Sequence, residues 1–308
     1  PSLVGSEMCI RDRVKGAASA LYGSNATGGV INIITKKTDK PWTLNVNGRL
    51  ARHNEQRYGA SFGLNGKRLC NMFTANYTDV DNFDVHSAAD PVTRIISTVY
   101  GDRTLNLKDQ LVWSPSHNVE IGGRVGYFFR QTTRTAEQPE RYRDFSGGLR
   151  IDWTLSDHDM LQANYAFDQY DKSDYQKLRK LDIRDYSNVR NMFRLLYNHT
   201  FGSGDILTAG ADFMHDYLFN TNLDNTERKQ DSFDFFMQYD WRISQKLEAV
   251  GAVRYDYFSD GGESRLTPKL NLCYKPVRNL SLRAGYGMGF RAPTLKEKYY
   301  DFDMAGIW

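Results

Sequence analysis

The stretch from Leu247 to Phe258 reads LEAVGAVRYDYF, and its residues alternate in character one by one. One set of alternate positions is small or apolar: Leu247, Ala249, Gly251, Val253, Tyr255 and Tyr257. Charged residues, among them Arg254 and Asp256, stand between them. Because a β-strand places successive side chains on opposite faces, this pattern predicts a strand with one apolar and one polar face.

The same alternation recurs through most of the chain and predicts about thirteen strands. They fall at roughly 42–51, 57–65, 68–79, 102–114, 118–132, 143–155, 159–170, 187–201, 205–219, 231–243, 247–258, 265–275 and 279–290. Most are longer than the about nine to eleven residues that a tilted strand needs to cross a bilayer. Strands of soluble proteins are commonly about five or six residues long. The lengths therefore favour an all-β, antiparallel transmembrane barrel over a soluble β-protein whose aromatic residues fill an ordinary core.

The predicted connections alternate between short turns and longer polar loops. Short turns are expected at 65–68, 114–118, 156–159, 202–205, 244–246 and 275–279. Longer loops are expected at 80–101, 132–143, 170–187, 220–231 and 258–265. Outer-membrane barrels show this asymmetry between periplasmic turns and extracellular loops. Aromatic residues gather at strand ends, where a membrane-interface girdle would place them: Tyr217, Phe219, Phe233, Trp241, Tyr255, Tyr257 and Phe258.

Composition agrees with a barrel. The 308 residues include 19 Tyr, 17 Phe and 5 Trp, which is 13% aromatic, while the mean hydropathy is −0.60. No run of about eighteen apolar residues is present, so the sequence predicts no transmembrane helix. The formal net charge of +3 is too small to indicate nucleic acid as a partner. Cys9, Cys70 and Cys273 are scattered and odd in number, which argues against a disulfide framework or a zinc site.

If the apolar set faces lipid, the opposite set faces the barrel interior. Its basic members are Lys108, Arg124, Arg130, Arg150, Arg190, Arg194, Arg242, Arg254 and Arg283. Its acidic members are Glu120, Asp152, Asp234, Asp240, Glu248 and Asp256. On a lipid face each midplane basic residue would cost about 2–4 kcal/mol, so the set must face water or a polar filling. The arginines then either pair with a plug or with lumen neighbours, or line a path for an anionic solute.

A different kind of sequence precedes the strands: residues 14–37 read VKGAASALYGSNATGGVINIITKK. Small residues and glycines surround a tyrosine and lead into an Ile/Val strand. The glycines allow positive φ and a close backbone approach, as a compact piece pressed against a barrel wall requires. This stretch resembles the end of the plug domain of TonB-dependent outer-membrane receptors. The residues that carry the resemblance are Leu21, Tyr22, Gly23, Gly28, Gly29 and Asn32.

A second resemblance to this family lies at the other end of the chain, in GYGMGFRAPTLKEKYYDFDMAGIW. Phe290, Arg291, Ala292 and Pro293 match a run that leads from a mid-barrel strand into a loop. Pro293 would end a strand in any protein. Haem receptors of the family carry an Asn-Pro-Asp/Asn-Leu box after this run, with a histidine between the two, and the chain ends before either. This run also occurs in siderophore receptors and discriminates weakly between ligands.

The resemblance implies a barrel of twenty-two strands, of which about thirteen are present, behind the tail of a plug. We expect a non-native leader at 1–13, which resembles translated adaptor sequence, the end of the plug at 14–40 and a truncated barrel at 41–308. The resemblance also implies a receptor in the outer membrane of a Gram-negative bacterium, one that takes up an iron complex, either ferric siderophore or haem. Its partners would be outer-membrane lipid, the ligand and the inner-membrane TonB complex, reached through the missing N-terminal part. Alternatives are import of cobalamin, oligosaccharide or peptide, then a passive porin or an outer-membrane hydrolase.

No catalytic constellation or cofactor motif emerges from the sequence. The six histidines are dispersed, and there is no G-x-S-x-G elbow and no P-loop. We therefore expect no enzyme and no resident cofactor or metal. One candidate for a ligand contact is His86 in the long loop 80–101, whose imidazole would bind haem iron; the alternative is an ordinary solvated histidine.

Overall fold

The structure is a computed structural model that describes residues 8–15, 29–35, 40–90, 92, 94–133, 139–223, 226–277 and 279–299. Its strands are β1 (Met8–Lys15), β2 (Gly29–Thr35), β3 (Trp42–Ala51), β4 (Glu55–Asn65), β5 (Leu69–Val80), β6 (Phe83–His86), β7 (Ile95–Val99), β8 (Asp102–Ser116), β9 (Val119–Thr132), β10 (Glu140–Thr154), β11 (Asp159–Gln176), β12 (Leu181–Thr200), β13 (Ile206–Asn220), β14 (Glu227–Ser244), β15 (Leu247–Phe258), β16 (Glu263–Val277) and β17 (Leu280–Gly287). One short helix follows, α2 (Leu295–Tyr299).

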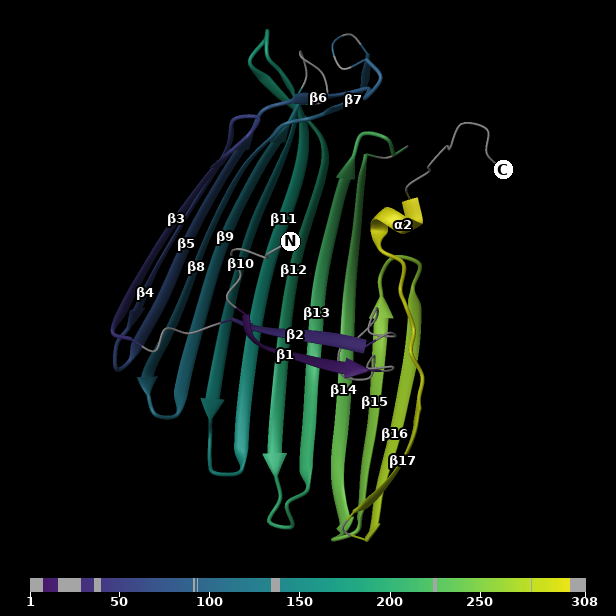
Figure 1. Cartoon of the computed structure of the whole chain (residues 1–308). Helices are drawn as coiled ribbons and strands as arrows, with labels where there is room; N and C mark the ends of the chain where they lie inside the picture. The colour runs from purple at the N-terminus through teal and green to yellow at the C-terminus, as the bar shows by residue number, and fades with distance from the viewer. Residues whose placement is uncertain are drawn as a thin grey trace.

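Thirteen strands form one antiparallel sheet, in the order β17-β16-β15-β14-β13-β12-β11-β10-β9-β8-β5-β4-β3. Each strand pairs with its neighbour in sequence, except that β5 pairs with β8 across the small β6–β7 hairpin. Figure 1 shows this sheet as a curved wall that stays open, with β3 and β17 at its two edges. The predicted antiparallel meander of about thirteen long strands is confirmed. Within the described ranges, no helix has the length and apolar character needed to cross a membrane.

The predicted loops at 170–187 and 258–265 are too long, because the strands continue through most of the first and half of the second. β11 is 18 residues long and β12 is 20, and only 177–180 separates them. The extension is rich in charge and therefore has the composition of a loop. In the fold, these charges pair across strands: Lys172 Nζ lies 3.2 Å from Asp185, and Asp182 accepts from both Arg141 and Arg143. Similarly, β15 and β16 leave only 259–262 between them.

The long loop predicted at 80–101 contains secondary structure. β6 and β7 form a separate two-stranded hairpin there, projecting from the upper edge of the sheet in Figure 1. The ring of His53, in the neighbouring β3–β4 connection, stacks on Phe83 at the start of β6, with ring centroids 3.8 Å apart.

The strand register defines the two faces of the sheet. Arg194, Asp212, Asp234 and Asp256 are direct cross-strand neighbours from β12 to β15, so their side chains share one face. The other face carries exposed apolar side chains such as Phe235 and Leu270. The assignment of the polar set to one face is confirmed for all its members that the register places. Phe258 was assigned to the interface girdle and this is wrong: it is 6% exposed and shares the face of Asp256 and Arg254, because its position has their parity.

Tryptophans mark one level of the apolar face. Trp42, Trp113, Trp153 and Trp241 all lie at the end of the sheet where the short turns are, and each is about half exposed. Indole rings prefer the boundary between hydrocarbon and water. We therefore take this level as the periplasmic interface and the opposite edge, with the β6–β7 hairpin, as the extracellular rim.

The piece that precedes the sheet is described only as the pair β1–β2. The two strands are antiparallel, with Asn32 opposite Asp12, and in Figure 1 they are drawn across the face of β11 to β15. β1 includes part of 1–13, the range expected to be a non-native leader. A strand forms from either a native or a foreign sequence, so the division of the chain at residues 13 and 40 remains a prediction.

Candidate functional site

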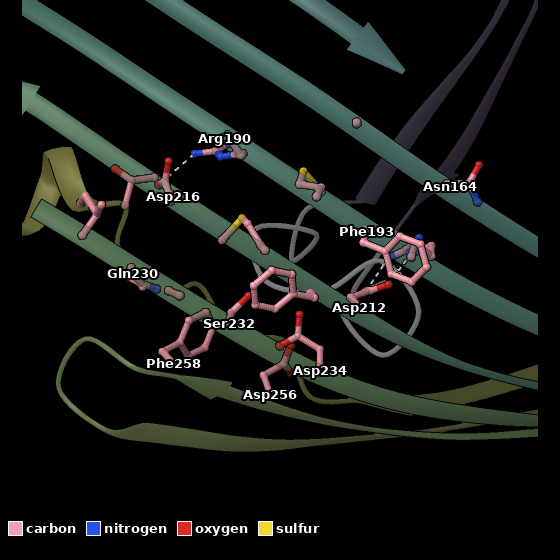
Figure 2. A pocket seen from close by; sticks show the side chains of 18 of the residues that line it. Asn164, Arg190, Phe193, Asp212, Asp216, Gln230, Ser232, Asp234, Asp256 and Phe258 are labelled. Atoms are coloured by element: carbon pink, nitrogen blue, oxygen red, sulfur yellow. Dashed lines mark hydrogen bonds and ion pairs between the residues drawn. The ribbon is translucent and has the colours of Figure 1, made fainter. Parts of the chain in front are cut away.

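The polar face of the sheet carries a hollow over strands β11 to β15. The hollow has a volume of about 580 Å³. Its floor comes from the strands and one side from the segment after β17, Ala292–Leu295. Figure 2 shows the carboxylates of Asp212, Asp234 and Asp256 with Arg190 and Gln230 around it.

Arg254 is the centre of the charge cluster in this wall. Its side chain is 2% exposed, and it contacts three aspartates at once: Asp256 at 2.7 Å, Asp234 at 2.9 Å and Asp212 at 3.0 Å. These contacts come from β13, β14 and β15, so one guanidinium ties three strands together. Arg254 Nη1, Asp234 Oδ1 and Asp256 Oδ2 are buried without a hydrogen-bond partner among the described residues. Such a cluster requires its basic member, because an isolated buried charge is strongly unfavourable.

A second arginine extends the cluster to β12. Arg194 donates through Nε and Nη2 to the two oxygens of Asp212, each at 2.7 Å, which is the bidentate geometry of a strong ion pair. The ring of Phe236 lies close to both guanidinium groups, 5.5 Å from that of Arg194 and 5.3 Å from that of Arg254. Gly210 leaves the room for this ring, because a Cβ there would collide with it and would stand 2.7 Å from the main-chain oxygen of Leu195.

Most arginines of the polar face have acidic neighbours. Arg190 contacts Asp216 at 3.3 Å, and Asn188 donates to the same aspartate at 2.9 Å. Arg130 pairs with Asp102, and Arg150 pairs with Asp152. Pairing with lumen neighbours, one of the two explanations predicted for these arginines, is thus observed. The wall around the hollow presents no uncompensated positive charge from Arg190, Arg194 or Arg254.

The motif Phe290–Pro293 leads directly into a short helix that stands over this wall. Phe290 makes an edge-to-face contact with Phe258, with ring centroids 6.2 Å apart. Leu295, the first residue of α2, is 1% exposed and packs with Leu218 and Leu223. The motif therefore connects the last strand to a helix anchored on β13 and its following loop.

A reciprocal cap holds α2. The main-chain N–H of Thr294 donates to Glu297 Oε2 at 3.0 Å, and the N–H of Glu297 donates to Thr294 Oγ1 at 3.3 Å. Arg291 contacts the same carboxylate. The Thr294 N–H bond and these partners lower the pKa of Glu297 below its ordinary value. At the other end Lys298 and Tyr299 contact Asp260 in the β15–β16 turn, and the bond to Asp260 raises the pKa of the Tyr299 hydroxyl.

The structure does not bring the other predicted site residues to the hollow. Leu21, Tyr22, Gly23 and Gly28 lie outside the described residues, and of Gly29 and Asn32 only the backbone in β2 is described. His86 ends β6 on the projecting hairpin and is exposed, so its role as a ligand contact stays a prediction. In the described part of the chain, no group of three or more His, Cys, Asp or Glu side chains has the arrangement of a metal site.

Sequence reasoning missed two parts of the site. Asp212 and Asp216 were absent from the predicted acidic set. They lie four residues apart in β13, and both have the parity of the polar face. The signal T-x-x-E at Thr294–Glu297 was also present, since it is the usual pattern of a helix cap. Both omissions could have been found by extending the strand parity and the cap pattern to the whole sequence.

Comparison with known proteins gives consistent results. Residues 166–307 match the family model described as TonB dependent receptor-like, beta-barrel. The iron-regulated outer membrane virulence protein of Vibrio cholerae is 23% identical over 92% of this chain and 44% of its own length. The vitamin B12 transporter BtuB of the same organism is 24% identical over 93% of this chain and 47% of its own. The chain thus spans about half the length of these relatives.

The fold is also found in solved structures. A mutant ferric enterobactin receptor (PfeA) of Pseudomonas aeruginosa superimposes with a TM-score of 0.70 at 17% identity, over 93% of this chain and 49% of that one. At this identity the match concerns the fold alone.

Proposed function

The chain belongs to the β-barrel family of TonB-dependent receptors, and from this premise we propose that it forms one wall of an energy-coupled importer of iron complexes, ferric siderophore or haem. Its location is the outer membrane of a Gram-negative bacterium. The family is one of receptors and transporters, and the proposal includes no catalytic step.

The observation that carries the proposal is the hollow on the lumen face below α2. At about 580 Å³ it is in the size range of sites for compact organic ligands, about 300–1,000 Å³, and is much larger than a bare ion needs. Its mixed lining of paired charges, Met192, Met214 and Phe258 suits a large solute with both polar and apolar surface. The binding energy of the solute would be exerted on the plug, and the TonB complex would supply the work that moves the plug.

We propose iron complexes rather than other solutes because of the names that similar proteins carry. One relative carries the name iron-regulated outer membrane virulence protein, and a solved neighbour is a ferric enterobactin receptor. The predicted attraction of anionic chelates by a basic lumen gains no further support at the hollow, since Arg190, Arg194 and Arg254 each pair with an aspartate. The same charge balance favours cobalamin as the second candidate, together with the similarity to BtuB.

The plug assignment belongs to the proposal as well. We assign residues 14–40 to the end of a plug and 41–308 to the barrel; Gly29 and Asn32 of the plug motif belong to β2. A plug of this kind fills the lumen, which makes a passive porin the weaker alternative. Coupling to the TonB complex would require a segment N-terminal to the plug.

Growth on single nutrient sources tests the proposal. The full-length gene is expressed in a strain that lacks its own iron and cobalamin receptors, and growth is compared on haem, a ferric catecholate, a ferric hydroxamate and cobalamin. We expect growth on at least one iron source, and its loss when tonB is deleted. Growth on cobalamin alone would instead establish the second candidate.

A further inference from the structure

The buried charges of the Arg254 cluster do not balance. Its basic members are Arg194 and Arg254, and its acidic members are Asp212, Asp234 and Asp256. The cluster would therefore carry one net negative charge if all three carboxyl groups were ionised. Because an uncompensated buried charge is strongly unfavourable, the site needs either a further positive charge or a proton.

The neighbouring strand β16 does not supply that positive charge. Arg265 is the cross-strand partner of Asp256, but its side chain is 60% exposed and its ion-pair partner is Glu263. Lys269, on the same face of β16, lies opposite Ala252. Ala252 is four residues from Asp256 along β15, which is about 13 Å at the usual rise of a strand. Neither basic residue therefore compensates the cluster.

The other described neighbours of the cluster are neutral as well. Arg190, on the β12 side of the hollow, is paired with Asp216. Gln230 and Ser232 of β14 carry no charge, and the segment after β17 that forms one side of the hollow contains no charged residue. Among the residues that the structure describes, the missing positive charge thus has no source.

Asp234 and Asp256 are in contact with each other. They are direct cross-strand partners on β14 and β15, and Figure 2 shows both at the hollow. Their carboxyl groups lie within hydrogen-bond reach of one another. Asp234 Oδ1 and Asp256 Oδ2 are buried without a described donor, whereas Arg254 contacts the second oxygen of each. Since two ionised carboxylates can only accept, a hydrogen bond between them requires a proton.

We propose that Asp234 and Asp256 share one proton in the folded receptor, held between Asp234 Oδ1 and Asp256 Oδ2. The proton is taken from water and removes the excess charge. The pair then carries one negative charge, which Arg254 balances, while Arg194 balances Asp212. Two carboxyl groups in contact and away from water hold one proton in this way, because like charges at such a distance cannot both form.

A proton suits this position better than a metal cation does. Only two carboxylate oxygens of the cluster are free, Asp234 Oδ1 and Asp256 Oδ2. Calcium takes about six to eight oxygen ligands, and magnesium also requires a nearly complete octahedral shell. The described part of the chain offers no group of side chains arranged for a metal ion. A single proton needs only the two oxygens.

The shared proton determines the charge of the hollow, because both aspartates line it. With the proton, the wall that the cluster forms has no net charge. Without it, the wall would carry an additional negative charge and would repel an anionic ferric chelate in the lumen. This consequence for the solute rests on the proposed function, whereas the shared proton does not.

Infrared spectroscopy of the full-length receptor in lipid bilayers at neutral pH tests the shared proton. A protonated carboxyl group has a carbonyl band separate from the bands of a carboxylate, and this band shifts in heavy water. We expect the band in the parent protein and its loss in both Asp234→Asn and Asp256→Asn. In each variant the amide N–H takes the place of the shared proton, and the remaining aspartate is a carboxylate.

Asp216→Asn is the matched control, because Asp216 is 4% exposed and lines the same hollow. Arg190 and Asn188 already donate to its two oxygens, so it needs no proton. Its replacement should leave the carboxylic acid band unchanged. Only receptor that is folded, as judged by its heat-sensitive mobility on gels, enters the comparison.

Three results would overturn the proposal. The parent protein shows no carboxylic acid band, as expected if a basic residue of the plug or a metal cation balances the cluster. The band persists in both Asp234→Asn and Asp256→Asn. The band is lost equally in Asp216→Asn. None of these results depends on which solute supports growth, so a failure of the proposed function is distinguished from a failure of the shared proton.

Discussion

Replacing Arg254 with alanine is expected to destabilise the folded barrel by about 3–5 kcal/mol, because it leaves Asp234 and Asp256 buried without a counter-charge. Arg254 is the only ion-pair partner of Asp234 and Asp256 among the described residues, and all three side chains are nearly fully buried. The free energy of unfolding is measured by urea titration of the full-length receptor in lipid vesicles, followed by tryptophan fluorescence.

Arg150→Ala provides the control. Arg150 also faces the lumen and pairs with Asp152 at 2.7 Å, but its side chain is 56% exposed. An exposed pair is worth about 0–1 kcal/mol, so this variant should remain close to the parent protein. A triple variant with R254M, D234N and D256L should recover much of the stability, because it removes the charges together. If R254A and R150A unfold at the same urea concentration, the Arg254 cluster does not stabilise the association of β13, β14 and β15.

Gly210→Ala is expected to cost about 1–3 kcal/mol by overpacking. The added Cβ would press on the ring of Phe236 and stand 2.7 Å from the main-chain oxygen of Leu195, which belongs to the neighbouring strand and has little freedom to move. Since Phe236 contacts both Arg194 and Arg254, its displacement would also disturb the charge cluster.

Gly251→Ala is the matched strand-interior control, because a Cβ there meets nothing within 4 Å. Its unfolding midpoint should equal that of the parent or exceed it slightly, as alanine restricts the unfolded chain. The same urea titration measures both variants. A midpoint for Gly210→Ala as high as that for Gly251→Ala would show that Phe236 does not occupy the place described.

The order of the strands and their two faces could be predicted from sequence because each strand is long and its side chains alternate with period two. Such a pattern determines parity, and parity alone assigns Arg194, Asp234 and Arg254 to the lumen face. The sequence could not show which charges meet. Arg254 contacts Asp212 two strands away only because of the register between the strands. Alternation does not determine the register, because a shift by any even number of residues keeps every side chain on the same face.

The errors have a common physical origin. Residues 171–187 are mostly polar, and polarity was interpreted as a loop. In the structure they extend two strands above the membrane, where Lys172 pairs with Asp185 and Asp182 pairs with Arg143 of β10. Above the bilayer both faces of a strand meet water, so the apolar half of the alternation disappears while the hydrogen-bonded ladder continues. Phe258 shows the converse: an aromatic residue at a strand end need not face lipid, because it is buried against Phe290 on the lumen side.

Spin-label accessibility along β9 tests most directly the claim that this chain is a membrane barrel wall with its charged face toward the lumen. Single nitroxides are placed at 121, 122, 124, 125, 127 and 128 of the full-length receptor in bilayers, and relaxation by oxygen is compared with relaxation by a water-soluble nickel complex. We predict high oxygen accessibility at Ile121, Val125 and Tyr127, whose side chains share the outward face, and low oxygen accessibility at Gly122, Arg124 and Phe128. Equal accessibility at all six positions, or maxima at Gly122, Arg124 and Phe128, would contradict the account.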